Sequence, residues 1–120
     1  RRFKMHKKVL QSLSTACEYN PKGHTLTRNR VLIGDKAGAK NFSLHHGVIQ
    51  PGGEAHPHKH DFEQGIYILR GKARISIEGE DTFEVGEDTA IFFPAERIHC
   101  ISAIGEEELK IIIVYSPPPQ

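Results

Sequence analysis

From Thr25 onward, short runs of β-branched, aromatic and aliphatic residues alternate with turn residues rich in glycine. The predicted strands are Thr25–Ile33, Phe42–Ile49, a histidine-bearing strand after Gly53, Ile66–Arg70, Ala73–Glu78, Thr82–Val85, Thr89–Phe93, Ile98–Ile104 and Leu109–Tyr115. Residues 50–53 (Gln-Pro-Gly-Gly) are expected to form a turn that closes the second strand. Many short strands at a regular spacing are typical of an all-β sandwich or barrel.

The two ends of the chain have a different pattern. In Lys4–Tyr19 the apolar positions Met5, Val9, Leu10 and Leu13 fit one amphipathic helical stripe, or else an irregular arm lying across a sheet. At the other end, Pro117–Pro119 cannot continue a central strand and are expected to form an exposed tail.

Composition narrows the class of protein. The chain has 120 residues and a formal net charge of +1, which suits one globular domain and offers no broad basic surface for nucleic acid or a membrane. No apolar run is long enough to span a bilayer, and no secretory signal pattern is present. Cys17 and Cys100 are too few and too far apart for a disulfide framework, so a cytoplasmic protein with reduced thiols is expected.

The segment from Pro51 to Gly71 carries the first chemical signal. His56, His58 and His60 occupy alternate positions, and side chains two apart on an extended strand leave from the same face. His58 and His60 can therefore present two imidazoles side by side, which is one edge of a metal site.

A second signal follows downstream at His99, which opens a predicted strand just after a turn at Pro94. A third imidazole there could complete a face of three histidines. With Gln64 the set has four ligands and leaves one or two positions open on the metal, as a working site requires.

These residues resemble the cupins, small double-stranded β-helix (jelly-roll) barrels. Gly52, His58, His60 and Gly71 match the first cupin motif, G-x5-H-x-H-x3,4-E-x6-G, and Gln64 takes the place of its glutamate. In the second motif, G-x5-P-x-G-x2-H-x3-N, only Pro94 and His99 match: Gly86 lies two residues too early, Glu96 replaces glycine and Ala103 replaces asparagine. The resemblance implies a barrel over residues 25–116, with an N-terminal arm or short helix at 1–24 and a tail at 117–120.

The resemblance also implies that His58, His60, His99 and Gln64 bind one divalent metal ion: Zn, Ni, Fe, Mn or Co. A glutamine in place of glutamate leaves the metal charge uncancelled, so the metal should be a stronger Lewis acid and should attract an anionic substrate. The expected function is a metalloenzyme of isomerase, tautomerase or lyase type acting on a small anionic, oxygen-rich molecule such as a sugar acid. A metal-dependent dioxygenase and a binding module that holds a small ligand without turnover are the alternatives.

Further pocket candidates are less specific. Tyr67 could act as an acid, Arg97 could meet a carboxylate, and His56 could bind the metal or shuttle protons; the alternatives are a core tyrosine, a solvated turn arginine and a rim histidine. Because they are adjacent, only one of His45 and His46 can face the interior, and likewise only one of the aromatic pair at 92 and 93. His6 and His24 are interpreted as surface residues.

The apolar run Ile111–Val114 lacks polar alternation, which is typical of a strand buried on both faces. With the N-terminal arm, it predicts a homodimer joined through packed sheets.

Overall fold

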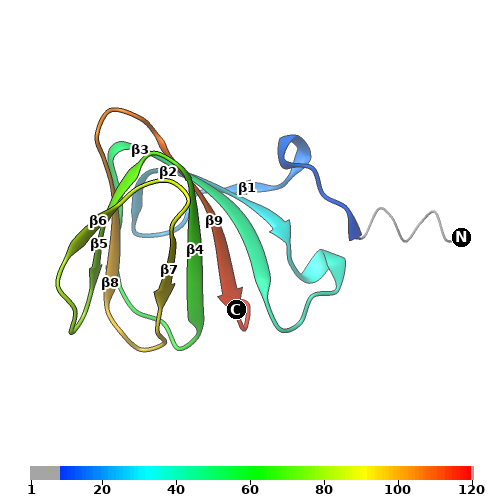
Figure 1. Cartoon of the computed structure of the whole chain (residues 1–120). Helices are drawn as coiled ribbons and strands as arrows, with labels where there is room; N and C mark the ends of the chain where they lie inside the picture. Colours follow the sequence, from blue (N-terminus) through cyan, green and yellow to red (C-terminus); the bar gives the residue numbers. More distant parts are fainter. Residues whose placement is uncertain (1–8, 120) are drawn as a thin grey trace, which may run out of the picture.

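The computed structural model describes residues 9–119, in which nine strands and two short 3₁₀ turns follow one another (Figure 1). The 3₁₀ turns are η1 (Leu13–Thr15) and η2 (Asp35–Ala37). The strands are β1 (Glu18–Tyr19), β2 (His24–Ile33), β3 (Ser43–His58), β4 (Glu63–Arg70), β5 (Lys72–Ile77), β6 (Phe83–Val85), β7 (Ala90–Phe93), β8 (His99–Ile104) and β9 (Leu109–Ser116).

All the strand pairs are antiparallel and form one sheet that curls into a barrel, with the order β6-β5-β8-β3-β9-β4-β7. β2 pairs with β3 and carries β1 on its other side. The prediction of an all-β jelly-roll barrel is therefore confirmed, and the predicted strands from residue 66 onward match the observed ones to within three residues at each end.

The turn predicted at residues 50–53 is wrong, because the chain continues there as one long strand, β3. Residues 43–49 of β3 pair with β9 and residues 54–58 pair with β8, while β2 pairs with β3 on both parts, from Leu44 to Ile49 and at Glu54 and Ala55. β3 thus crosses from one side of the barrel to the other. The glycines serve this crossing: Gly52 has φ of 87°, and a Cβ on Gly53 would lie 2.6 Å from the carbonyl oxygen of Thr25.

Inward-facing side chains fill the barrel with a core of isoleucine and alanine together with Leu109 and Phe93. Its largest fully buried apolar members are Phe93, Ile68, Ile75, Leu109 and Ile111. Burying each of these stabilises the fold by about 1.5–3 kcal/mol. This apolar packing holds the strands whose ends carry the polar site.

The expectation that Ile111–Val114 is buried on both faces is only half met within one chain. Ile111 and Ile113 point inward and are buried, whereas Val114 on the outer face is 36% exposed. Nearby on the same outer face, Tyr67 and Phe92 are exposed as well. A second copy could cover this face, and the homodimer stays a prediction.

The described part of the N-terminal arm, from residue 9 to β1, lies to one side of the barrel (Figure 1). Met5 and His6, and with them part of the predicted helix, lie outside the described residues; from residue 9 to β1 the chain forms only the turn η1, and Val9 and Leu10 are exposed. The guanidinium of Arg30 ties the arm to β2 by donating to the carbonyl oxygen of Leu13 at 2.9 Å. Within residues 9–119 no helix is long and apolar enough to cross a membrane.

Candidate metal centre

Three histidines from distant parts of the chain converge at one end of the barrel. His58 ends β3, His60 lies in the connection to β4, and His99 begins β8, where it pairs directly with His58. One ring nitrogen from each lies within 4.8 Å of the other two, and the ring centroids are 4.5–5.6 Å apart. We call these residues the three-histidine cluster.

The sequence suggested that alternation along one strand brings His58 and His60 together, but the structure shows a different arrangement. β3 ends at His58, so His60 is not on the strand. Its ring is instead held by a parallel stack on Phe62, with centroids 3.9 Å apart and an interplanar angle of 6°. The carbonyl oxygen of His60 also accepts a hydrogen bond from the backbone N–H of Glu96 at 2.8 Å, which joins the two histidine-bearing loops.

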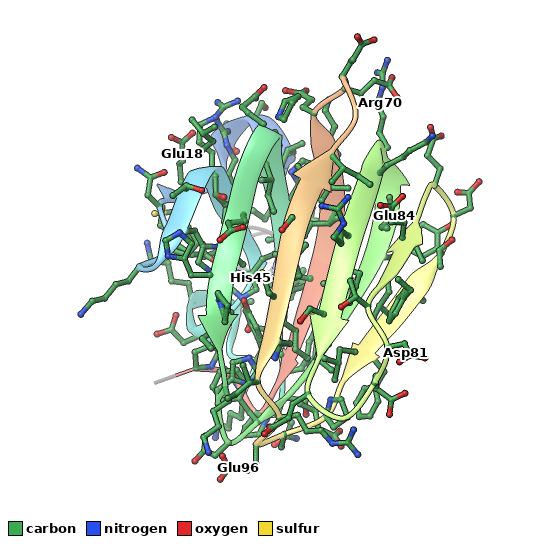
Figure 2. All side chains as sticks on the ribbon, turned by 90° about the vertical axis from the view of Figure 1, so that its left-hand side faces the viewer. Glu18, His45, Arg70, Asp81, Glu84 and Glu96 are labelled. Atoms are coloured by element: carbon green, nitrogen blue, oxygen red, sulfur yellow. The ribbon has the colours of Figure 1, made fainter. Side chains whose placement is uncertain are left out.

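Glu96 marks the end of the barrel where the cluster lies. It is at the opposite end from Arg70 (Figure 2). Its φ of 66° lies in the left-handed region that glycine adopts most readily, which explains why the second cupin motif has glycine at this position.

Each histidine of the cluster is oriented in the same way, by its own local backbone. The Nδ1 atoms of His58, His60 and His99 lie 2.6, 2.9 and 3.2 Å from the carbonyl oxygens of His56, Phe62 and Arg97, respectively. A carbonyl oxygen can only accept, so each Nδ1 carries the proton and each Nε2 keeps a free lone pair. Metal-binding histidines in proteins are commonly held in this way.

The free lone pair of His99 is the observation that best fits a bound cation. His99 is 1% exposed, and its Nε2 is buried without a hydrogen-bond partner. Burial, followed by the nearby His58, lowers the pKa of His99 to about 4, so the ring is neutral near pH 7 and ready to bind a metal. An unpartnered buried nitrogen is costly unless something fills the position.

Gln64 places an amide oxygen beside the three-histidine cluster. It points inward from β4, is 5% exposed, and its Oε1 lies 3.0 Å from the Nε2 of His60. With the amide in this orientation, two lone-pair-bearing atoms face each other, which a shared cation turns into a favourable arrangement. Adjacent ligands at about 2.1 Å from one metal are about 3 Å apart. Three imidazoles and an amide oxygen therefore fit a divalent metal ion.

Aromatic rings surround the cluster. Phe93 lies 4.6 Å from the ring of His99, and Tyr115 lies 6.1 Å from that of His60. Burial raises the pKa of Tyr115, so its phenol stays protonated. As the alternation of the strands requires, Phe93 faces inward while Phe92 faces out.

The three residues predicted as catalytic candidates do not join the cluster through their side chains. Tyr67 points outward and donates to Asp88 at 2.9 Å. The guanidinium of Arg97 contacts Glu80 at 3.4 Å, and His56 is an exposed rim residue with its Nε2 3.8 Å from Glu54. His56 and Arg97 contribute their backbone carbonyl oxygens instead.

A second polar cluster lies inside the barrel, around His45. Its Nδ1 is 2.7 Å from the hydroxyl oxygen of Tyr19, and its Nε2 is 2.8 Å from Oγ of Ser43. Burial lowers the pKa of His45 to about 4. His45 faces inward and His46 outward, so one of the pair is interior as expected, but the sequence did not indicate the contact with Tyr19.

His24 was interpreted as a surface residue, and this is wrong. Its Nδ1 is buried, and its ring lies 5.8 Å from that of His58. The register of β2 against β3 shifts between Thr25 and Thr27, where Leu26 has φ of 51°. This irregularity brings His24 to the inner side, which strict alternation from Thr27 would not predict.

The fold and the cluster define a jelly-roll barrel with a site that could hold a metal ion. Residues 45–115 match the cupin domain family, and the chain belongs to that family.

The chain is also similar to individual proteins. It matches the structure of the polyketide cyclase RemF from Streptomyces resistomycificus with a TM-score of 0.79 and 27% identity, over 88% of this chain and 77% of that one. It is 27% identical to the polyketide synthase CurC of Streptomyces cyaneus over 58% of this chain and 46% of CurC. It is 26% identical to the L-ectoine synthase of Desulfatibacillum aliphaticivorans over 88% of this chain and 79% of that protein. The chain spans less than two thirds of CurC and of several L-ectoine synthases that it matches.

Proposed function

We propose that this cupin is a metal-dependent enzyme that activates a small, oxygen-rich anionic molecule by Lewis-acid chemistry, as an isomerase, tautomerase or lyase. The observation that carries the proposal is the set of neutral ligands. Three imidazoles lie together, the Nε2 of His60 contacts the amide oxygen of Gln64, and the group of three that could hold a metal includes no carboxylate.

The missing carboxylate decides the type of chemistry. A divalent cation bound here would supply a strong Lewis acid for polarising a carbonyl or carboxylate oxygen. His58, His60 and His99 hold their lone pairs inward through backbone hydrogen bonds. The rings of Phe62, Phe93 and Tyr115 pack beside these histidines, and such an apolar surrounding strengthens electrostatic attraction. A site with uncancelled positive charge favours anionic oxygen ligands and opposes further oxidation of the metal.

The relatives support chemistry that forms bonds rather than oxidises. RemF is named a polyketide cyclase, CurC a polyketide synthase, and the third relative L-ectoine synthase. Polycarbonyl compounds of polyketide type are therefore tested beside sugar acids.

The test begins with protein purified without an affinity tag, whose metal is identified by elemental analysis. Sugar acids, polycarbonyl compounds and aromatic acids are then screened by thermal shift, and products of each hit are identified by mass spectrometry. A His99→Ala variant is the control. Metal-dependent conversion without oxygen uptake is expected. Oxygen consumption would indicate a dioxygenase instead, and binding without conversion a ligand-binding module; a protein that retains no metal would overturn the proposal.

A further inference from the structure

Three side-chain atoms within residues 9–119 are buried without a hydrogen-bond partner: Nε2 of His99, Nδ1 of His24 and Oδ1 of Asn29. The proposed metal ion accounts for Nε2 of His99. Because buried polar atoms are nearly always paired in folded proteins, the second needs its own explanation.

The position of His24 is fixed by the backbone around it. It begins β2 and pairs with Ala55 of β3, and the neighbouring N–H of His56 donates to the carbonyl oxygen of Gly23 at 3.0 Å. The ring of His24 is tilted by 45° against that of His58, with centroids 5.8 Å apart. Strand pairing therefore holds the ring of His24, with its unpartnered Nδ1, next to the ring of His58.

His24 is nevertheless not a further ligand of the metal. Two ligands of one cation, each about 2.1 Å from it, are at most about 4.2 Å apart. The group whose ligand atoms lie within 4.8 Å of one another consists of His58, His60 and His99 and does not include His24. A contact between His24 and the metal centre has to pass through an atom that the metal itself holds.

We propose that His24 is a substrate-binding residue whose Nδ1–H donates a hydrogen bond to the oxygen atom bound at the open position of the metal. With a metal held by the three-histidine cluster, this oxygen would be that of water in the free site and that of a carboxylate or carbonyl group of the substrate in the occupied site. The inference rests on the proposed metal centre. It makes His24, rather than Tyr67 or Arg97, the side chain that fixes the orientation of an oxygen ligand there.

The test uses the full chain loaded with Co²⁺, whose visible absorption reports changes in its ligands. Acetate, a minimal carboxylate, is titrated into the wild-type protein and into His24→Ala, His24→Asn and His46→Ala. Loss of one hydrogen bond to an anionic oxygen should weaken acetate binding about tenfold in His24→Ala. Its Co²⁺ affinity should stay within about threefold of the wild type, because no metal ligand is lost.

The other two variants separate a direct contact from a general disturbance. In His24→Asn the amide nitrogen lies close to the position of the imidazole Nδ1, so acetate binding should recover to within about threefold of the wild type. His46 lies on the outer side of β3 near Lys110, and His46→Ala should bind acetate like the wild type.

Each outcome decides one question. If His24→Ala binds acetate as tightly as the wild type, or loses Co²⁺ to the same extent as acetate, the role of His24 is overturned while the metal centre stands. If His24→Asn fails to recover binding, the contact is not a hydrogen bond from Nδ1 and the inference fails. If the wild-type protein takes up no Co²⁺, both the metal centre and the role of His24 are overturned.

Discussion

The barrel contains two groups of buried polar side chains built around histidine, and they use the imidazole in opposite ways. At His45 both ring nitrogens contact protein oxygens, on Tyr19 and Ser43. In the three-histidine cluster each ring has its Nδ1 on a backbone carbonyl. Among residues 9–119, the Nε2 of His99 has no hydrogen-bond partner, and that of His60 contacts Gln64. A histidine whose two nitrogens are satisfied supports the fold, whereas one with a nitrogen left over can bind a ligand.

The largest difference between the two groups is expected when one histidine is removed from each. His99→Ala should lower metal affinity by more than about 100-fold, since it removes a ligand rather than a supporting hydrogen bond. His45→Ala should leave the metal content unchanged but reduce the free energy of unfolding by about 2–4 kcal/mol, through a cavity and an unpartnered Tyr19 hydroxyl. Elemental analysis and urea unfolding measure the two effects. Metal loss in both variants would show that the two groups form one site.

A pH titration of unfolding tests how burial affects the histidine of each group. The pKa values of His45 and His99 are lowered to about 4 by burial, so the unfolded chain binds protons more readily than the folded one between about pH 6.5 and 4. The free energy of unfolding should therefore fall as the pH drops through this window and level off below it.

The share of His45 in this loss is on the order of 2–3 kcal/mol. His45→Gln should flatten the pH dependence of urea unfolding for the metal-free protein between pH 7 and 4.5. An unchanged slope in that variant would mean that the acid sensitivity comes from other groups.

Gln64→Glu tests the charge of the site. A carboxylate should tighten metal binding about tenfold or more and reduce turnover, because it cancels part of the cation's charge. The neighbouring Glu63 is exposed, so Glu63→Gln changes the net charge by one unit in the opposite direction without touching the cluster, and it should leave metal affinity unchanged. Competition with a chromogenic chelator measures both. Equal metal retention in wild type and Gln64→Glu would contradict the argument that the amide leaves the charge uncancelled.

The smallest effect is expected at the ring that supports His60. Phe62→Leu removes the parallel stack at 3.9 Å and should weaken metal binding about two- to fivefold, because His60 lies in a connection rather than on a strand. Phe92→Leu, on the outer face of β7, serves as the matched control and should have no effect. A loss in both variants would indicate a general decrease in stability, which unfolding curves would reveal.

The sequence was sufficient to predict the fold class and the convergence of the three-histidine cluster, because glycine-bounded alternating strands and two histidine motifs are local signals. It predicted that His58, His60, Gln64 and His99 lie together, and the structure brings them together. It did not predict the path of the chain that brings these residues together. The continuation of β3 through residues 50–53 depends on pairing with β2, β8 and β9, which lie far away in the sequence.

The same limit explains His24 and Tyr19. His24 faces the site only because the register of β2 against β3 shifts at Leu26, and Tyr19 reaches His45 only because β1 pairs with β2. No spacing within the chain encodes either contact. The metal identity, the substrate, the cytoplasmic location and the homodimer stay predictions.

The three carbonyl groups that fix the imidazoles each belong to a residue only two positions away along the chain. Main-chain oxygens are present whatever side chain the residue carries. The side chains at positions 56 and 97 can therefore change while the three imidazoles keep their orientation, so the residues that could hold a metal do not depend on which side chains stand at these two positions. Substitutions at these two positions can therefore vary the surroundings of the three-histidine cluster without altering the cluster itself.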